Sequence, residues 1–116
     1  MNDFRRGTRI SRRISVVLVS IDDGPRFSDA GITLLINPQG CALRAGQPIE
    51  IGRAVRLEGL PINYLVTARV ANCISFGQHE KFWVIGLALD EPGNVWGVED
   101  PPADWDINDT RLSVNY

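Results

Sequence analysis

The sequence has very little lysine, a single histidine and no long hydrophobic run. Lys81 is its one lysine against eleven arginines, so positive charge is carried by a side chain that grips phosphate bidentately and stacks on flat rings. No apolar run approaches the length of a membrane span. The basic N-terminus leads into polar residues instead of the apolar stretch of a signal peptide. We therefore expect no membrane insertion and a cytoplasmic location.

Cysteine and histidine are too few for most catalytic or metal-binding patterns. Cys41 and Cys73 lie 32 positions apart, without the spacing of a redox or zinc motif, so we expect reduced thiols packed in the interior. His79 is accompanied by no serine or cysteine motif that would supply a nucleophile for it to activate. The sequence thus favours a binding module over an enzyme, and we expect neither a cofactor nor a bound metal.

No segment has the apolar spacing of a long helix. Short runs rich in β-branched residues alternate with clusters of Gly, Pro, Asn and Asp, as strands and turns do. Within one run, Tyr64, Val66, Ala68 and Val70 fall on the same face of a strand. Six such strands without intervening helices favour an antiparallel barrel, whose closure removes exposed sheet edges. The expected strands are 14–21, 31–36, 41–43, 54–57, 64–70 and 82–89.

The net charge of −2 hides an asymmetry between the two ends of the chain. Residues 1–13 carry five arginines and one acid, whereas the segment from Asp90 onward carries seven acids and one arginine. We therefore divide the chain into a basic arm (1–13), a barrel (14–98) and an acidic tail (99–116). Such a split indicates an anion site at one end and disfavours a nucleic-acid interface, which needs a broader basic and aromatic surface.

The acidic tail contains one pattern that resembles a calcium loop. It begins at Asp104 but lacks glycine at the sixth position and the final bidentate glutamate, so we interpret it as a solvated tail. Residues 103–116 are expected to form a short helix or turn packed by Trp105, or a loose tail. Trp83 and Trp96, like Trp105, are expected to be packing residues.

Three segments together resemble the PilZ domain family. Residues 5–9 (RRGTR) are similar to the family's RxxxR arm, residues 33–43 (TLLINPQGCAL) resemble the segment that carries its [D/N]xSxxG motif, and residues 84–89 (VIGLAL) resemble a late strand. The resemblance covers roughly residues 4–98. It implies a bacterial six-stranded β-barrel, and many members of this family bind cyclic di-GMP.

The [D/N]xSxxG segment can be aligned in two ways. Anchoring on Gly40 places Leu35 at the acid or amide position and Asn37 at the serine. Anchoring on Asn37 instead places Gln39 at the serine and Ala42 at the glycine. We prefer the first alignment, because Gly40 opens directly into an apolar segment. In it, Leu35 replaces a polar group that would read a guanine edge, and a buried base edge left unpaired costs affinity.

The chemistry of cyclic di-GMP suggests a role for each candidate residue. Arg5 and Arg9 would clamp phosphate oxygens or guanine O6 and N7, and Arg6 would stack on a purine face. Gly40 would let the backbone approach the ligand closely. Asn37 is the remaining candidate contact, although the proline and glycine that follow it first of all predict a turn.

Two functions remain open from the sequence. The first is a PilZ-like sensor or effector module that binds cyclic di-GMP, with an arm that becomes ordered on binding. The alternative is a degenerate PilZ domain that does not bind nucleotide and acts as a protein–protein adaptor. The three arginines of the RxxxR segment favour the first function, and Leu35 favours the second.

Overall fold

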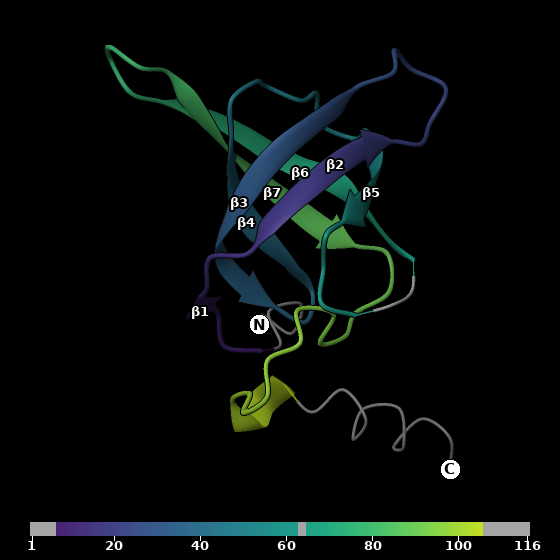
Figure 1. The fold of residues 1–116 in the computed structure, drawn as a ribbon, viewed down its shortest axis with the longest axis vertical. Coiled ribbons are helices and arrows are strands. Elements are labelled where there is room, and N and C mark those ends of the chain that lie inside the picture. The colour runs from purple at the N-terminus through teal and green to yellow at the C-terminus, as the bar shows by residue number, and fades with distance from the viewer. Residues whose placement is uncertain (1–6, 63–64, 106–116) are drawn as a thin grey trace, which may run out of the picture.

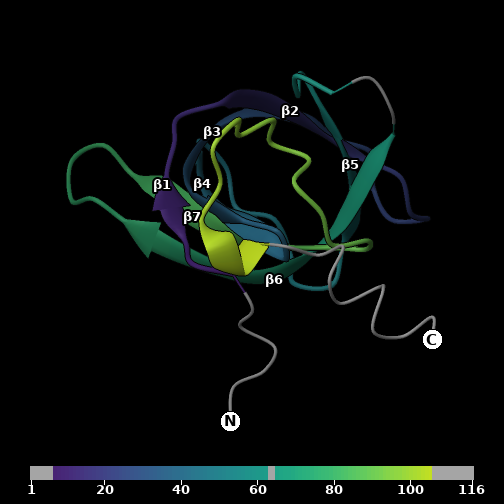
Figure 2. The ribbon, with the colours of Figure 1, turned by 90° about the horizontal axis from the view of Figure 1, so that it is seen from below.

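The structure is a computed structural model that describes residues 7–62 and 65–105. Six antiparallel strands close into a barrel, and a seventh short strand lies outside it against β3 (Figures 1 and 2). The six-stranded antiparallel barrel expected from the sequence is therefore confirmed. The elements are β1 (Ile10–Ser11), β2 (Ser15–Ser20), β3 (Ser28–Asn37), β4 (Gly40–Ala45), β5 (Ala54–Glu58), β6 (Val66–Phe76), β7 (Phe82–Leu89) and the short 3₁₀ turn η2 (Ala103–Trp105).

Closure of the barrel depends on β3, which pairs on both sides. The strands follow the order β3-β2-β5-β6-β7-β4, and β4 pairs again with β3 from Gly31↔Ala45 to Asn37↔Gly40. Alternate residues of each strand point inward. In β6, Val66, Ala68 and Val70 are buried as the alternation predicts. The largest fully buried apolar side chains inside the barrel include Leu18, Ile36, Leu43, Val55, Val70 and Ile85.

One end of the barrel is covered by the segment that follows β7. Seen from below, this segment crosses the open end before it reaches η2 (Figure 2). Trp96 and Trp105 are 2% and 4% exposed and belong to the core, while Trp83 is partly buried and packs against it. The packing role expected of all three tryptophans is confirmed.

The described structure differs from the expected boundaries at several places, and both β3 (Ser28–Asn37) and β4 (Gly40–Ala45) are longer than expected. β1 lies within the expected arm and pairs with β3 through Ile10↔Ile36, because Ile10 can pack against the core. η2 brings the expected tail back onto the core through Trp105. β6 continues to Phe76, six residues beyond the expected end of this strand at residue 70, because its ladder with β7 extends that far.

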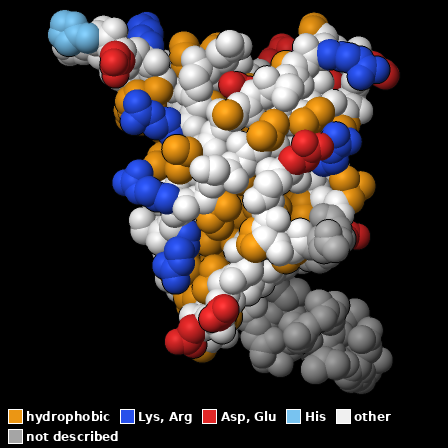
Figure 3. All heavy atoms as spheres, in the orientation of Figure 1, with side chains coloured by type: hydrophobic (Ala, Val, Ile, Leu, Met, Phe, Trp, Pro, Cys, Tyr) orange, Lys and Arg blue, Asp and Glu red, His pale blue; other side chains and the backbone are white. Residues whose placement is uncertain are grey.

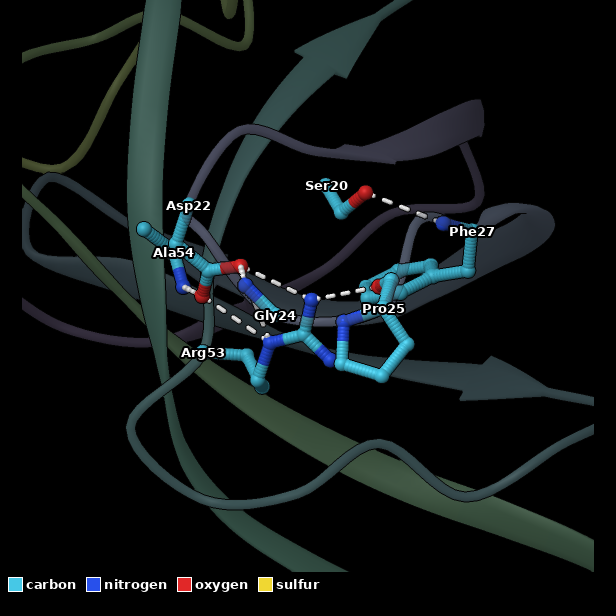
Figure 4. A network of polar contacts seen from close by, with 7 residues as sticks. All are labelled: Ser20, Asp22, Gly24, Pro25, Phe27, Arg53 and Ala54. Atoms are coloured by element: carbon cyan, nitrogen blue, oxygen red, sulfur yellow. Dashed lines mark hydrogen bonds and ion pairs between the residues drawn. The ribbon is translucent and has the colours of Figure 1, made fainter.

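A polar network ties the β2–β3 loop to the start of β5 (Figure 4). Arg53 Nε and Nη2 donate to the Asp22 carboxylate at 2.8–3.1 Å, and Asp22 also accepts from the backbone N–H groups of Gly24 and Ala54. The hydrogen bonds from Arg53, followed by the bond from Ala54 N–H, hold the pKa of Asp22 well below its usual range. The sequence predicted a turn here, and the ion pair fixes that turn to β5.

Candidate functional site

Three of the five candidate ligand residues line one hollow on the outside of the barrel. The hollow has a volume of about 510 Å³, and Arg9, Asn37 and Gly40 all contribute to its wall. Arg5 and Arg6 lie outside the described residues. Leu35 lines the same hollow and is 38% exposed, so it belongs to the surface and not to the core.

Small residues from neighbouring strands form the floor of this hollow. Leu35 pairs with Ala42, and Ala42 pairs in turn with Gly86, so these three residues follow one another across β3, β4 and β7. Ala88 lies two positions further along β7 and is exposed on the same side. The Asn72 side chain of β6 lies against Gly86, whose N–H donates to Asn72 Oδ1 at 3.1 Å, so the floor offers a ligand both methyl groups and one side-chain amide.

Asn37 uses most of its hydrogen-bonding capacity within the protein. Its Oδ1 accepts from the backbone N–H groups of Gln39 and Gly40, both at 3.0 Å, which closes the β3–β4 turn. Its Nδ2 donates to Gly7 O at 3.1 Å. Of the four hydrogen bonds that the amide can make, one donor is left. The geometry therefore gives Asn37 the role in the turn that the sequence predicts first, adds a contact to the N-terminal segment, and leaves one amide hydrogen for the ligand contact.

Gly40 is required by a protein contact. A Cβ atom at this position would collide with the carbonyl oxygen of Leu87 on β7, since the two strands approach each other closely at Gly40↔Ala88. The sequence predicts that this glycine lets a ligand approach the backbone closely. In the structure, the close approach of β7 already requires a glycine here, and Gly40 also lines the hollow.

Residues near the C-terminal end of the described chain hold the N-terminal segment beside the hollow. Thr8 N–H donates to both carboxylate oxygens of Asp104 at 3.0 Å, and Thr8 Oγ1 donates to the same group at 2.8 Å. Trp105 Nε1 donates to Thr8 O at 2.6 Å. These contacts fix the residue immediately before Arg9. We call Asp104 and Trp105, with the Thr8 that they bind, the terminal clasp.

The electrostatic character of the hollow suits an anion. Arg9 is exposed at its rim, and no carboxylate is among the described residues that line it. Gln39, also in the wall, has a buried Oε1 without a hydrogen-bond partner among the described groups. Burial raises the pKa of the Cys41 thiol to about 12, so this wall residue stays protonated and is a poor nucleophile.

Acid should loosen the terminal clasp. The hydrogen bonds from Thr8, first from its N–H and then from its hydroxyl, lower the pKa of Asp104. A carboxylate whose pKa is lower in the folded state stabilises the fold fully above its unfolded value of about 3.9. That contribution is lost as the pH falls from there through the lowered pKa.

The measurement is hydrogen exchange at the Thr8 amide, followed from neutral pH downward. We expect protection in the native chain to fall in this acid range, and Asp104→Asn to exchange faster at neutral pH with a flatter pH dependence. Asp22→Asn is the control, because Asp22 has a lowered pKa but lies in the β2–β3 network. A Thr8 amide that is equally protected in Asp104→Asn would contradict the clasp.

Comparison with protein families, characterised proteins and solved structures gives no significant match for this chain. Among the described residues, no group of three or more His, Cys, Asp and Glu side chains is placed to hold a metal ion. No helix in the same residues is long and apolar enough to cross a membrane.

The residues of the terminal clasp are not predicted by the sequence. Asp104 is expected there in a solvated tail, and Trp105 is expected to pack, with no partner assigned to it. The one available signal was a tryptophan in an otherwise polar, acidic segment, which often marks a point where a tail returns to the core.

Proposed function

We propose that this protein is a PilZ-like, non-enzymatic module of the cytoplasm that binds cyclic di-GMP in the hollow beside Arg9. The observation that carries the proposal is that Arg9 and both candidate serine positions, Asn37 and Gln39, line the same hollow. In either alignment of the motif, its polar residues therefore lie beside the arginine of the RxxxR segment.

The parts of the hollow match the parts of the ligand. The methyl groups of Ala42 and Ala88 and the Asn72 amide in the same wall would give a purine ring both apolar contact and a hydrogen-bonding group. Arg9 would place its guanidinium against a phosphate or against guanine O6 and N7. The free acceptor of Gln39, once turned outward, could take a ring N–H, which the apolar Leu35 cannot do.

Calorimetry with cyclic di-GMP and the Arg9→Ala variant tests this function. Loss of a charge-assisted contact should weaken binding by about 1.5–3 kcal/mol, or roughly 10- to 150-fold. Arg13→Ala is the matched control, because Arg13 is exposed, follows in the same basic segment and does not line the hollow. Equal affinities in the Arg9 and Arg13 variants would show that Arg9 does not contact the ligand.

A second candidate function is a protein–protein adaptor that binds no nucleotide. It is favoured by a larger hollow of about 730 Å³, which contains none of the candidate ligand residues. Ile32, 43% exposed, and Phe82 line this hollow, and the Arg44 guanidinium lies 3.9 Å above the Phe82 ring. Figure 3 shows hydrophobic side chains reaching the surface between basic ones.

The two functions differ in what cyclic di-GMP does to the protein. Under the first, the ligand raises the melting temperature, and the shift grows with the logarithm of the ligand concentration once that exceeds the dissociation constant. Under the second, calorimetry records no binding heat, the melting temperature does not move, and Ile32→Lys abolishes capture of a protein partner. A shift in melting temperature that is as large in Arg9→Ala as in the native chain, at the same ligand concentration, would show that Arg9 does not contact the ligand.

A further inference from the structure

β6 is longer than the strand that pairs with it on one side. The shorter neighbour is β5. The last hydrogen bonds on its side of β6 run from Val70 N–H to Arg53 O at 3.0 Å and from Gly52 N–H to Val70 O at 2.8 Å. Beyond them, residues 71–76 have only β7 as a strand neighbour within the described chain. We call residues 71–76 the open edge. Figure 1 shows the β6–β7 hairpin projecting beyond the rest of the barrel.

The pairing of β7 determines which peptide groups face the open edge. Leu89 N–H donates to Gln39 O on the β4 side at 2.8 Å, so by alternation Ile85 also bonds toward β4. Cys73 lies opposite Ile85, and its peptide groups therefore point away from β7. Ser75, two residues further along, repeats this orientation. The N–H and C=O groups of Cys73 and Ser75 are thus available to another strand.

The open edge lacks the features that usually prevent strands from pairing. Its sequence, ANCISF, contains no charged residue, proline or glycine, whereas natural edge strands commonly carry charge or proline against association. On one face of it, Ile74 and Phe76 are 53% and 45% exposed. The Phe76 ring stacks on Phe82 at a centroid distance of 5.7 Å, which holds this apolar face in place.

We propose that the open edge binds the open edge of a second copy of this chain, as an antiparallel pair about a two-fold axis. In this register, the peptide groups of Cys73 hydrogen-bond to those of Ser75 in the second copy. The peptide groups of Ser75 hydrogen-bond in the same way to those of Cys73 in the second copy, which gives about four backbone hydrogen bonds in all. Ile74 lies opposite Ile74 of the second copy. Because a two-fold axis places like against like, an uncharged edge meets no repulsion, and the apolar rows of the two hairpins become continuous.

Analytical ultracentrifugation of the full chain over a range of concentrations tests the dimer. We expect a monomer–dimer equilibrium in the native chain and a dissociation constant at least about tenfold higher in Ser75→Pro, which removes one edge donor from each copy. Proline should be tolerated in the monomer, because this N–H does not bond to β7. Ser75→Thr keeps the donor and should dimerise as the native chain does.

Cross-linking tests the register without relying on the proline variant. In a chain with Cys41→Ser and Cys73→Ser, Ile74→Cys should form a disulfide-linked dimer on mild oxidation. Val84→Cys is the matched control: Val84 pairs with Ile74 on β7, so its two copies would lie about 14 Å apart, too far for a disulfide. Any one of three results would overturn the proposal. These are a native chain that stays monomeric, a dimer whose dissociation constant is unaffected by Ser75→Pro, and equal cross-linking of Ile74→Cys and Val84→Cys.

Discussion

Replacing Gly40 with alanine is expected to lower the free energy of unfolding by about 3 kcal/mol or more. The added Cβ would collide with the Leu87 carbonyl oxygen, which belongs to the backbone of β7 and cannot move aside as a side chain could. To relieve the collision, β4 must separate from β7 at one of the seams that close the barrel. Urea denaturation gives the change directly, as a lower midpoint at similar slope.

Gly46→Ala is the control for this substitution. Gly46 lies at the other end of β4, is exposed, and has no atom within 4 Å of the position that a Cβ would take. A change within about 0.5 kcal/mol is expected there, as at most exposed positions. If Gly40→Ala and Gly46→Ala had the same free energy of unfolding, β4 and β7 would not approach each other as closely at position 40 as the structure shows. A requirement for glycine there would then have to come from a ligand.

The fold was predictable because the features that determine it, the alternation within strands and the turn residues between them, can be seen in short stretches of sequence. Alternation in β6, with Val66, Ala68 and Val70 buried, is visible in the sequence as every second residue being apolar. Gly and Pro clusters mark the turns, and six short strands without helices leave few ways to bury their apolar faces other than by closing the sheet. The lengths of β3 and β6 were less predictable, because pairing extends strands into segments of weak strand propensity.

The roles of the candidate site residues were less predictable, because they depend on contacts between distant segments. Asn37 and Gly40 were found from their motif, but their partners Gly7 and Leu87 are not implied by it. The terminal clasp joins Thr8 to Asp104 across 96 positions. No local pattern indicates that pairing. The motif did identify residues that lie together, because Arg9, Asn37 and Gly40 all line one hollow.

The clasp also gives a physical reason for the position of Arg9 at the rim. Asn37 binds Gly7 O and the clasp binds Thr8, so the two residues preceding Arg9 are held from both sides. A side chain on a fixed backbone loses less conformational entropy on binding than one on a loose arm. The proposed ligand contact therefore depends on residues that do not touch the ligand.

Trp105→Ala is expected to release this segment and to cost about 3–5 kcal/mol of stability. The side chain is 4% exposed within the core cluster, and its Nε1–H donates to Thr8 O at 2.6 Å. Trp105→Phe keeps an aromatic ring in the core but loses the hydrogen bond and part of the indole packing, for a smaller cost of about 1–3 kcal/mol. Both variants are compared with the native chain by denaturant unfolding and by hydrogen exchange at the Thr8 amide.

Exchange at Thr8 distinguishes the clasp from simple packing. In Trp105→Phe, we expect the barrel strands to remain protected while the Thr8 amide exchanges faster, because its segment has lost one of its anchors. In Trp105→Ala, the same amide should lose most of its protection, and cyclic di-GMP should bind more weakly although Arg9 is unchanged. If Thr8 stays as protected in Trp105→Ala as in the native chain, the tryptophan serves only to cover the end of the barrel, and Asp104 and Asn37 hold the segment that carries Arg9 without it.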